Sequence, residues 1–291
     1  MSFFASIIPF EHSLGITPLL YGGWDLLVTD LEIGQIVEIP YGKQLENGIV
    51  AEIHDECPID ETSEAYMRIK PMSRIMTKKT LLAPYQIKMI VAIASKYMIA
   101  IHRVLAIFLT RPILSRLERK NYEQLEKQEI TIPKKWTGCI HIVKDSIVTP
   151  ALVDTYTQAW PIIVILPDDY AMMPYRESYR DREDVLFVSG DMTDIRRAQA
   201  WIDIANGKFR VIYWTRRIIY YNLGRYANII YVEDALGPDY WHYPIRIDYS
   251  DILHIFAKEN TNRDITILSS VPSLTTLTHF RHYQIANIRT T

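Results

Sequence analysis

The second half of the chain alternates short apolar runs with segments of helical periodicity, and this pattern restricts the fold more than any other feature. The apolar runs are residues 139–143, 162–166, 185–188, 209–213, 229–232 and 264–268. The helical segments are residues 149–160, 194–206 and 249–259, with Asp194 as a predicted N-cap and Asn206-Gly207 as a predicted stop. Apolar runs separated by helices are typical of a parallel sheet covered on both faces. We therefore predict an α/β lobe in this half.

The first 80 residues have a different pattern, in which short β-rich runs are separated by Gly, Pro and Asn. These runs are residues 5–9, 24–28, 36–39 and 48–53. Strands at this spacing predict a small barrel or curled sheet. The last two runs are joined by residues 40–48, PYGKQLENG, which we expect to form a loop.

Residues 81–110 repeat apolar side chains at helical spacing and should pack on this sheet as a helix. The predicted apolar face consists of Ile87, Ile90, Val91, Ala94 and Met98. Residues 115–135 are the most charged segment and contain little apolar material, so we predict a solvated, partly helical linker. The expected division is a β-rich domain at 1–114, a linker at 115–135 and the α/β lobe at 136–291.

Composition narrows the functional classes. The 291 residues carry a formal charge of −2, with 48% hydrophobic and 23% charged residues, which is typical of a globular protein. Any nucleic acid must therefore bind to a local basic face. Cys57, Cys139 and the eight scattered histidines match no metal or disulfide pattern, so we expect no metal and a reducing cytoplasm. Residues 86–109 are the longest apolar segment, but Lys, His and Arg interrupt them, which argues against a membrane span.

Two acids, Glu233 and Asp234, close the apolar run at 229–232. Ligands of open α/β sheets bind at the carboxyl ends of the strands, and in P-loop ATPases an acid at that place holds Mg²⁺. A strand that leaves a sheet must also meet water, and it often does so through Asp or Glu. The choice between these interpretations depends on a phosphate-binding loop upstream.

The expected position of that loop is the stretch IHIVKDSIVTPAL, which contains no glycine. A phosphate cradle needs backbone conformations that Val and Ile do not adopt, so Lys144 and Ser146 cannot form a Walker loop. We therefore expect no Mg·ATP, no cofactor and no ATPase activity, and Glu233 and Asp234 are interpreted as a degenerate Walker B pair.

The stretch IGQIVEIPYGKQLENGIVAEI resembles the N-terminal domain of the bacterial primosomal protein N′ (PriA) family of replication-restart helicases. Pro40, Tyr41, Gly42 and Lys43 stand where that family has a Pro-Phe-Gly-Lys loop. Residues 19–21 stand where it has Phe-Asp-Tyr, so that Leu20 replaces the Asp that contacts a terminal nucleotide. The resemblance implies binding of a DNA 3′ end, with Tyr21, Tyr41, Gly42 and Lys43 as DNA-binding residues and weakened recognition of a 3′ hydroxyl.

The second half also resembles the family, in a series of short signatures that occur in the same order. Trp214, Thr215 and Arg216 stand in the places of its Gly-Thr-Arg motif, YVEDALGPDY resembles its acidic motif, and ILSSVPSLTTL resembles its Gly-Ser-Ala-Thr-Pro-Ser motif. The resemblance implies a RecA-like first helicase lobe and adds Arg216 as a DNA-binding residue. The family's winged helix, zinc-binding cysteines and second lobe have no counterpart in this sequence.

These expectations support a protein that binds single-stranded or forked DNA, recruits replication or primosome proteins, and lacks a motor. Arg216, Arg217 and Arg225 alternate with Tyr220 and Tyr221, and such a pattern can hold phosphates and stack bases. Two alternatives stay open. The chain could be the N-terminal part of a diverged 3′-to-5′ helicase, or a protein-interaction scaffold that does not bind DNA.

Overall fold

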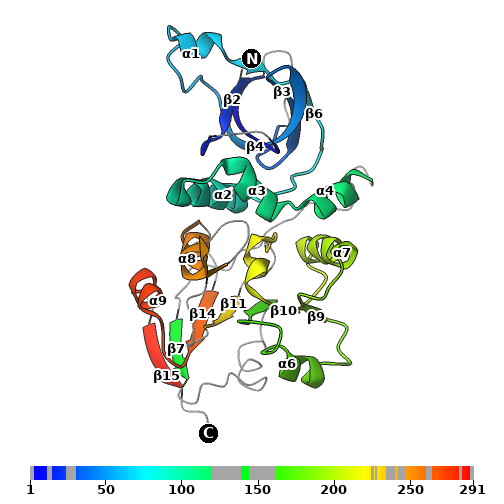
Figure 1. Cartoon of the computed structure of the whole chain (residues 1–291), viewed down its shortest axis with the longest axis vertical. Coiled ribbons are helices and arrows are strands. Elements are labelled where there is room, and N and C mark those ends of the chain that lie inside the picture. The colour runs from blue at the N-terminus through cyan, green and yellow to red at the C-terminus, as the bar shows by residue number, and fades with distance from the viewer. Residues whose placement is uncertain are drawn as a thin grey trace. The chain divides into compact units, whose positions relative to one another are not determined.

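The structure is a computed structural model that divides into two compact units, residues 1–127 and 128–291. It describes residues 3–11, 15–23, 31–119, 139–143, 161–223, 226, 228–233, 240–241, 247–259, 264–281 and 284–288. Each unit has its own sheet, and Figure 1 shows the two sheets with their helices. The predicted strand at 24–28 and the predicted helix at 149–160 lie outside the described residues.

The first unit is built on a six-stranded curled sheet with the order β5-β2-β1-β4-β3-β6. Its strands are β1 (Phe4–Pro9), β2 (Leu19–Gly22), β3 (Ile36–Tyr41), β4 (Gln44–His54), β5 (Lys70–Pro71) and β6 (Arg74–Ile75). All neighbours are antiparallel except β2 and β5. The sheet closes on a core that includes Ile7, Tyr21, Val37, Ile39 and Val50, and Figure 1 shows it curled into a ring. The predicted curled sheet is confirmed.

The helical segment of the first unit is broken where a single helix was predicted. Its helices are α1 (Glu64–Met67), α2 (Pro84–Tyr97), α3 (Ile101–Phe108) and α4 (Arg111–Glu118). Met98 ends α2 in the left-handed conformation, with φ 52°, and its side chain is 74% exposed, so its place on the predicted buried face was wrong. Ile87, Ile90 and Ala94 are buried as expected. In this unit α2 packs on β4 and α3 packs on β1.

The second unit is built on a seven-stranded sheet with the order β15-β7-β14-β11-β8-β10-β9. Its strands are β7 (Cys139–Val143), β8 (Ile162–Ile165), β9 (Val185–Val188), β10 (Val211–Trp214), β11 (Asn228–Val232), β14 (Asp264–Ser269) and β15 (Gln284–Ile288). All of the described pairings are parallel, and every residue of β8 and β10 is buried. The predicted parallel sheet is therefore confirmed, with β11 at its centre. The strand β15 was not predicted.

The other described elements of the second unit are short helices and one small hairpin. They are α6 (Met173–Ser178), α7 (Asp194–Ala205), η1 (Arg216–Tyr220), α8 (Tyr249–Glu259), α9 (Leu274–His279), β12 (Tyr240–Trp241) and β13 (Ile247–Asp248). The N-cap of α7 is Thr193, whose hydroxyl accepts from the backbone N–H of Arg196, so the prediction of Asp194 was one residue late. Gly207 has φ +69° and follows the end of α7, which agrees with the predicted stop.

Candidate nucleic-acid interface

The β3–β4 hairpin has a two-residue turn, Gly42-Lys43, instead of the expected long loop. Tyr41 pairs with Gln44, and the ladder continues from there to Ile36 and Ile49. Gly42 has φ +59°, and a Cβ built on it would meet open space, so the backbone conformation, not lack of room, requires glycine. Residues 44–48 looked like a loop because they are polar, but they pair as the start of β4. The hairpin therefore carries a short and well-defined tip.

Tyr21 lies beneath this tip and belongs to the core of the curled sheet. Its side chain is 5% exposed, and its hydroxyl donates to the carbonyl oxygen of Pro40 at 3.4 Å. Burial, followed by the neighbouring Glu46 and Tyr41, raises the pKa of Tyr21 to about 12. The ring therefore offers no open face for a terminal base. The stacking role expected for Tyr21 is replaced by support of β3 from within the core.

Two lysines lie at the tip, one in the turn itself and one in a neighbouring strand. Lys43 is exposed in the turn, and the Nζ of Lys70, from β5, donates to the carbonyl oxygen of Gly42 at 3.4 Å. Lys70 could not be grouped with the hairpin from the sequence, because only the pairing of β5 with β2 brings it there. Tyr41 is half-buried at the end of β3 and supplies an aromatic ring next to the turn. The tip can therefore present two cations and one ring to a ligand.

Acids also surround the tip and limit its positive charge. Arg74 is held by Glu38, with 3.0 Å between the guanidinium NH2 and Oε1. Glu46 accepts a hydrogen bond from the backbone N–H of Glu11. Among the described residues at the tip, Lys43 and Lys70 are thus the cations that no carboxylate holds.

The second group of predicted DNA-binding residues, around Arg216, does not form an exposed aromatic surface. Arg216 starts η1, directly after β10, and its side chain lies outside the described atoms. The neighbouring Tyr220 and Tyr221 are 3% and 6% exposed. The Tyr221 ring packs on Trp214 with 4.4 Å between centroids. These tyrosines belong to the core, so they are not a stacking surface, and the alternation of Arg and Tyr in the sequence was misleading.

At the acidic end of β11, the carboxylate of Glu233 is hydrogen-bonded within the protein. Glu233 is 6% exposed, and its carboxylate accepts hydrogen bonds from the backbone N–H of Ser273, at 3.2 and 3.3 Å, and from the hydroxyl of Thr276 at 2.7 Å. Ser273 is the N-cap of α9, so Glu233 anchors the start of that helix. Asp234 lies outside the described residues. The carboxylate of Glu233 therefore has a structural role, which is to hold the first turn of α9.

In the part of the chain that the structure describes, no three His, Cys, Asp or Glu side chains gather as metal ligands. Among the helices of the same residues, none combines the length and the apolar character that crossing a membrane requires.

Comparison with known proteins places the first unit. Residues 23–110 match the model of the PriA 3′DNA-binding domain (3′BD), a segment that includes the hairpin tip and begins two residues after Tyr21. A search of curated proteins found no match. Among solved structures, the crystal structure of the Pyrococcus furiosus Hef helicase domain is similar at 13% identity and a TM-score of 0.39. That similarity covers 53% of this chain and 35% of the other. Over residues 23–110, this chain is therefore similar to the 3′DNA-binding domain of PriA.

Proposed function

We propose that the protein binds single-stranded or forked DNA through the β3–β4 hairpin tip, in replication restart and without an ATP-driven motor. The match of residues 23–110 to a DNA-binding domain carries this proposal, because the tip lies within the matched segment. Lys43 and Lys70 can neutralise neighbouring phosphates, and Tyr41 offers the ring that Tyr21 does not.

Selectivity for a free 3′ hydroxyl should be weak. Leu20, which stands where the PriA family has an Asp, lies in β2 opposite Ser6 and is half-buried. An aliphatic side chain cannot accept a hydrogen bond from a terminal hydroxyl, and a lost hydrogen bond of this kind costs about 1–3 kcal/mol. We therefore expect similar affinities for strands that end in a 3′ hydroxyl and in a 3′ phosphate.

Two observations support the proposal that the chain has no ATP-driven motor. The segment at 144–150, which would have to form the phosphate cradle, contains no glycine. Glu233, which would act on Mg·ATP in a working lobe, holds the start of α9 instead. We expect neither DNA-stimulated ATP hydrolysis nor a rise in Tm with Mg·ATP, and a rise of several degrees would contradict this part of the proposal.

The DNA-binding part is tested by fluorescence anisotropy with a labelled single strand at several salt concentrations. The double variant Lys43→Ala/Lys70→Ala should bind roughly tenfold more weakly, and the slope of log K against log salt should fall by about 1.4 because each phosphate contact contributes about 0.7. Lys88→Ala is the matched control, since Lys88 is an exposed lysine on α2 of the same unit. It should bind like the parent protein.

Two results would refute the assignment. If the parent protein does not bind at micromolar concentration, the chain has lost DNA binding and a protein-interaction role becomes the better hypothesis. If the parent binds but the double variant and Lys88→Ala are indistinguishable, the hairpin tip is not the site.

A further inference from the structure

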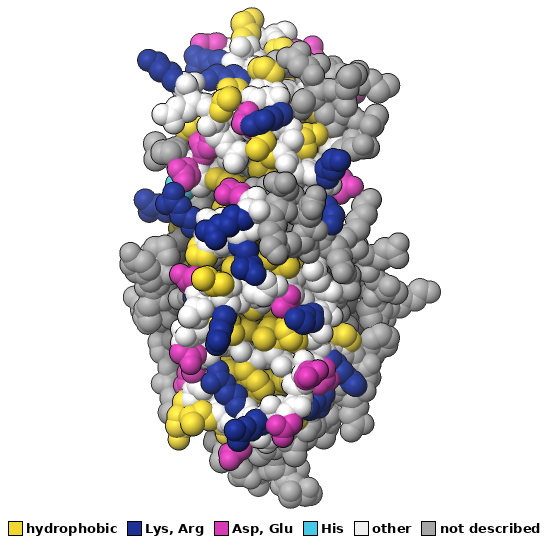
Figure 2. Space-filling view, turned by 90° about the vertical axis from the view of Figure 1, so that its right-hand side faces the viewer, with side chains coloured by type: hydrophobic (Ala, Val, Ile, Leu, Met, Phe, Trp, Pro, Cys, Tyr) yellow, Lys and Arg dark blue, Asp and Glu magenta, His cyan; other side chains and the backbone are white. Residues whose placement is uncertain are grey.

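The second unit has a cavity of about 450 Å³ between α6, β9 and the start of α7. Its lining residues are Arg176, Tyr179, Arg180, Arg182, Val185, Phe187, Ser189, Asp191, Met192 and Arg196. Figure 2 shows the face of the second unit that carries these elements, where Lys and Arg side chains surround a group of hydrophobic side chains. The cavity lies beside the edge strand of the sheet, since β9 pairs with β10 on one side only among the described strands. It is separate from the hairpin tip and from the acidic end of β11.

Four arginines and one aspartate are among the described residues that line this cavity. Arg182 is already paired, because its guanidinium donates to both carboxylate oxygens of Asp184 at 2.9 and 2.7 Å. Arg176, Arg180 and Arg196 are exposed, and their guanidinium groups make no hydrogen bond or ion pair within the described part of the chain. These three cations are therefore available to an anionic ligand.

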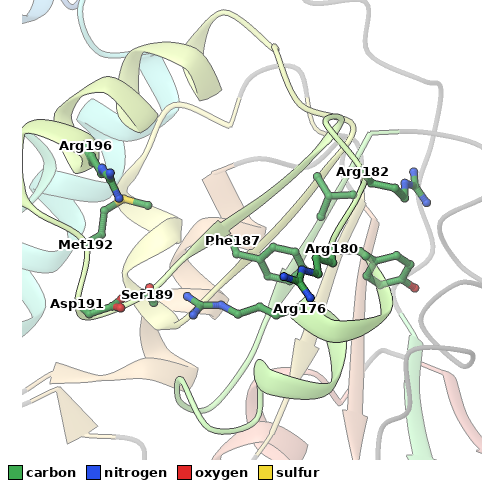
Figure 3. Close-up of a pocket in the computed structure, with 10 residues that line it drawn as sticks. Arg176, Arg180, Arg182, Phe187, Ser189, Asp191, Met192 and Arg196 are labelled. Atoms are coloured by element: carbon green, nitrogen blue, oxygen red, sulfur yellow. Dashed lines mark hydrogen bonds between the residues drawn. The ribbon is translucent and has the colours of Figure 1, made fainter.

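The single acid of the cavity is held on its wall. Asp191 accepts a hydrogen bond from the Ser189 hydroxyl, and this bond, with a smaller contribution from Arg176, lowers the pKa of Asp191. In Figure 3 Arg176 points from α6 toward Ser189 and Asp191, and Arg180 lies beside the ring of Phe187. The cavity keeps an excess of positive charge even with Asp191 ionised.

The floor of the cavity is a rigid aromatic ring. Val185 and Phe187 alternate along β9 and point to one face, as the period of a strand requires, and Ser189 follows directly after the strand. Phe187 is stacked on the buried Tyr213, with 4.9 Å between ring centroids and 11° between planes. The Tyr179 ring also stacks on Tyr213, with 5.8 Å between the ring centroids. Phe187 therefore has a fixed orientation and remains partly exposed toward the cavity.

We propose that this cavity binds one nucleotide unit of a single strand, with its phosphates on Arg176, Arg180 and Arg196 and its base against Phe187. Guanidinium groups around a fixed flat ring fit the two halves of a nucleotide, because arginine forks bind phosphate oxygens and every base has a face that stacks on an aromatic ring. The proposal shares its DNA ligand with the proposed function, but all of its residues lie in the second unit. It adds a second point of contact for the strand.

The test uses the full chain and two probes that contain 2-aminopurine, whose fluorescence is quenched when it stacks. One probe is a single-stranded oligonucleotide and the other is the free nucleoside monophosphate. Arg176→Gln/Arg180→Gln should weaken oligonucleotide binding roughly tenfold and lower the salt slope by about 1.4, which corresponds to two phosphate contacts. Phe187→Leu should leave the salt slope unchanged but abolish the quenching, because it removes only the flat ring.

Arg281→Gln is the matched control, since it removes one exposed arginine of the same unit outside the cavity. The cavity proposal is overturned if the double arginine variant binds like Arg281→Gln, or if the free monophosphate is the only probe that the variants affect. The hairpin variant Lys43→Ala/Lys70→Ala, measured in parallel, separates the two proposals. A chain that needs the lysines but not the arginines retains the hairpin site alone, whereas a parent chain that does not bind the oligonucleotide refutes both.

Discussion

The hairpin tip of the first unit and the acidic end of β11 both resemble known sites in the sequence, one a DNA-binding loop and the other a degenerate Walker B pair, but the fold uses their side chains in opposite ways. At the tip, Lys43 is exposed, and Lys70 joins it from another strand. At the end of β11, Glu233 is buried and bonded to the first turn of α9. The difference teaches that a residue type at the right place in a strand does not make a site. What decides is whether the surrounding elements already satisfy its polar atoms.

The largest effect should come from the residue that supports the tip. Tyr21→Ala removes a buried ring from the core of the curled sheet, so the free energy of unfolding should fall by about 3–4 kcal/mol in urea titrations. Tyr21→Leu and Tyr41→Leu then sharpen the comparison. The Tyr21 variant should lose stability with nearly parental DNA affinity at low temperature, and the Tyr41 variant the reverse. If Tyr21→Leu weakens DNA binding without lowering stability, Tyr21 is a contact residue after all.

A smaller loss of stability is expected at the other site. Glu233→Ala leaves the backbone N–H of Ser273 and the hydroxyl of Thr276 without their carboxylate, which should cost about 2–3 kcal/mol. Hydrogen exchange should be faster in α9 than in the parent, and DNA binding should not change. Asp181→Ala, an exposed acid of the same unit, serves as the control. If the Glu233 variant is as stable as the parent protein, Glu233 does not have the structural role of holding the first turn of α9, and a functional role becomes the better hypothesis.

The smallest expected effect is a loss of stability through Tyr21, which is absent at neutral pH and develops only at alkaline pH. The folded protein holds the Tyr21 phenol neutral up to about pH 12, whereas in the unfolded chain it ionises near its ordinary pKa of 10.0. Because ionisation favours the unfolded state over this interval, the stability that Tyr21 contributes is complete below pH 10 and is lost as the pH rises toward 12. Burial also raises the pKa of Tyr175 in the second unit, with the same sign.

The contribution of Tyr21 is isolated by comparison with Tyr21→Phe, which has no phenol at that position. The parent should lose more stability than this variant between pH 9 and pH 12, as followed by urea unfolding at each pH. Parallel curves for the two proteins would show that the hydroxyl of Tyr21 is exposed to solvent.

The two sheets could be predicted from the sequence because their buried strands are apolar over consecutive residues. Residues 162–165 and 211–214 are apolar at every position, and short runs of this kind between helices are typical of strands covered on both faces. The break at Met98 could not be predicted, because nothing local shows that an apolar residue will take a left-handed conformation and remain exposed. The turn at Gly42 was hidden by the polar residues that follow it, which pair in β4 despite their exposure.

The candidate sites depended more on tertiary structure. Tyr41, Gly42 and Lys43 are consecutive and could be grouped from the sequence, whereas Lys70 reaches them only through the pairing of β5 with β2. The arginine cavity of the second unit combines α6, β9 and α7, so its charges gather only once the strand between the helices is placed. The alternation of arginines with acids in residues 176–184 resembles an ordinary solvated surface. The proposed binding site therefore could not be recognised from the sequence.

The strand order of the second unit has a consequence for the protein while it is still on the ribosome. The strand β7 is the first of its sheet in the sequence, but its two neighbours are β14 and β15, which are the last. About 120 residues separate β7 from β14, and at typical synthesis rates they take roughly 6–25 seconds to emerge. During that interval β7 has no neighbour of its final sheet, whereas the curled sheet of the first unit is already complete. Nascent chains should therefore acquire a protease-resistant first unit well before the second, and chaperones that shield apolar strands should act on the second.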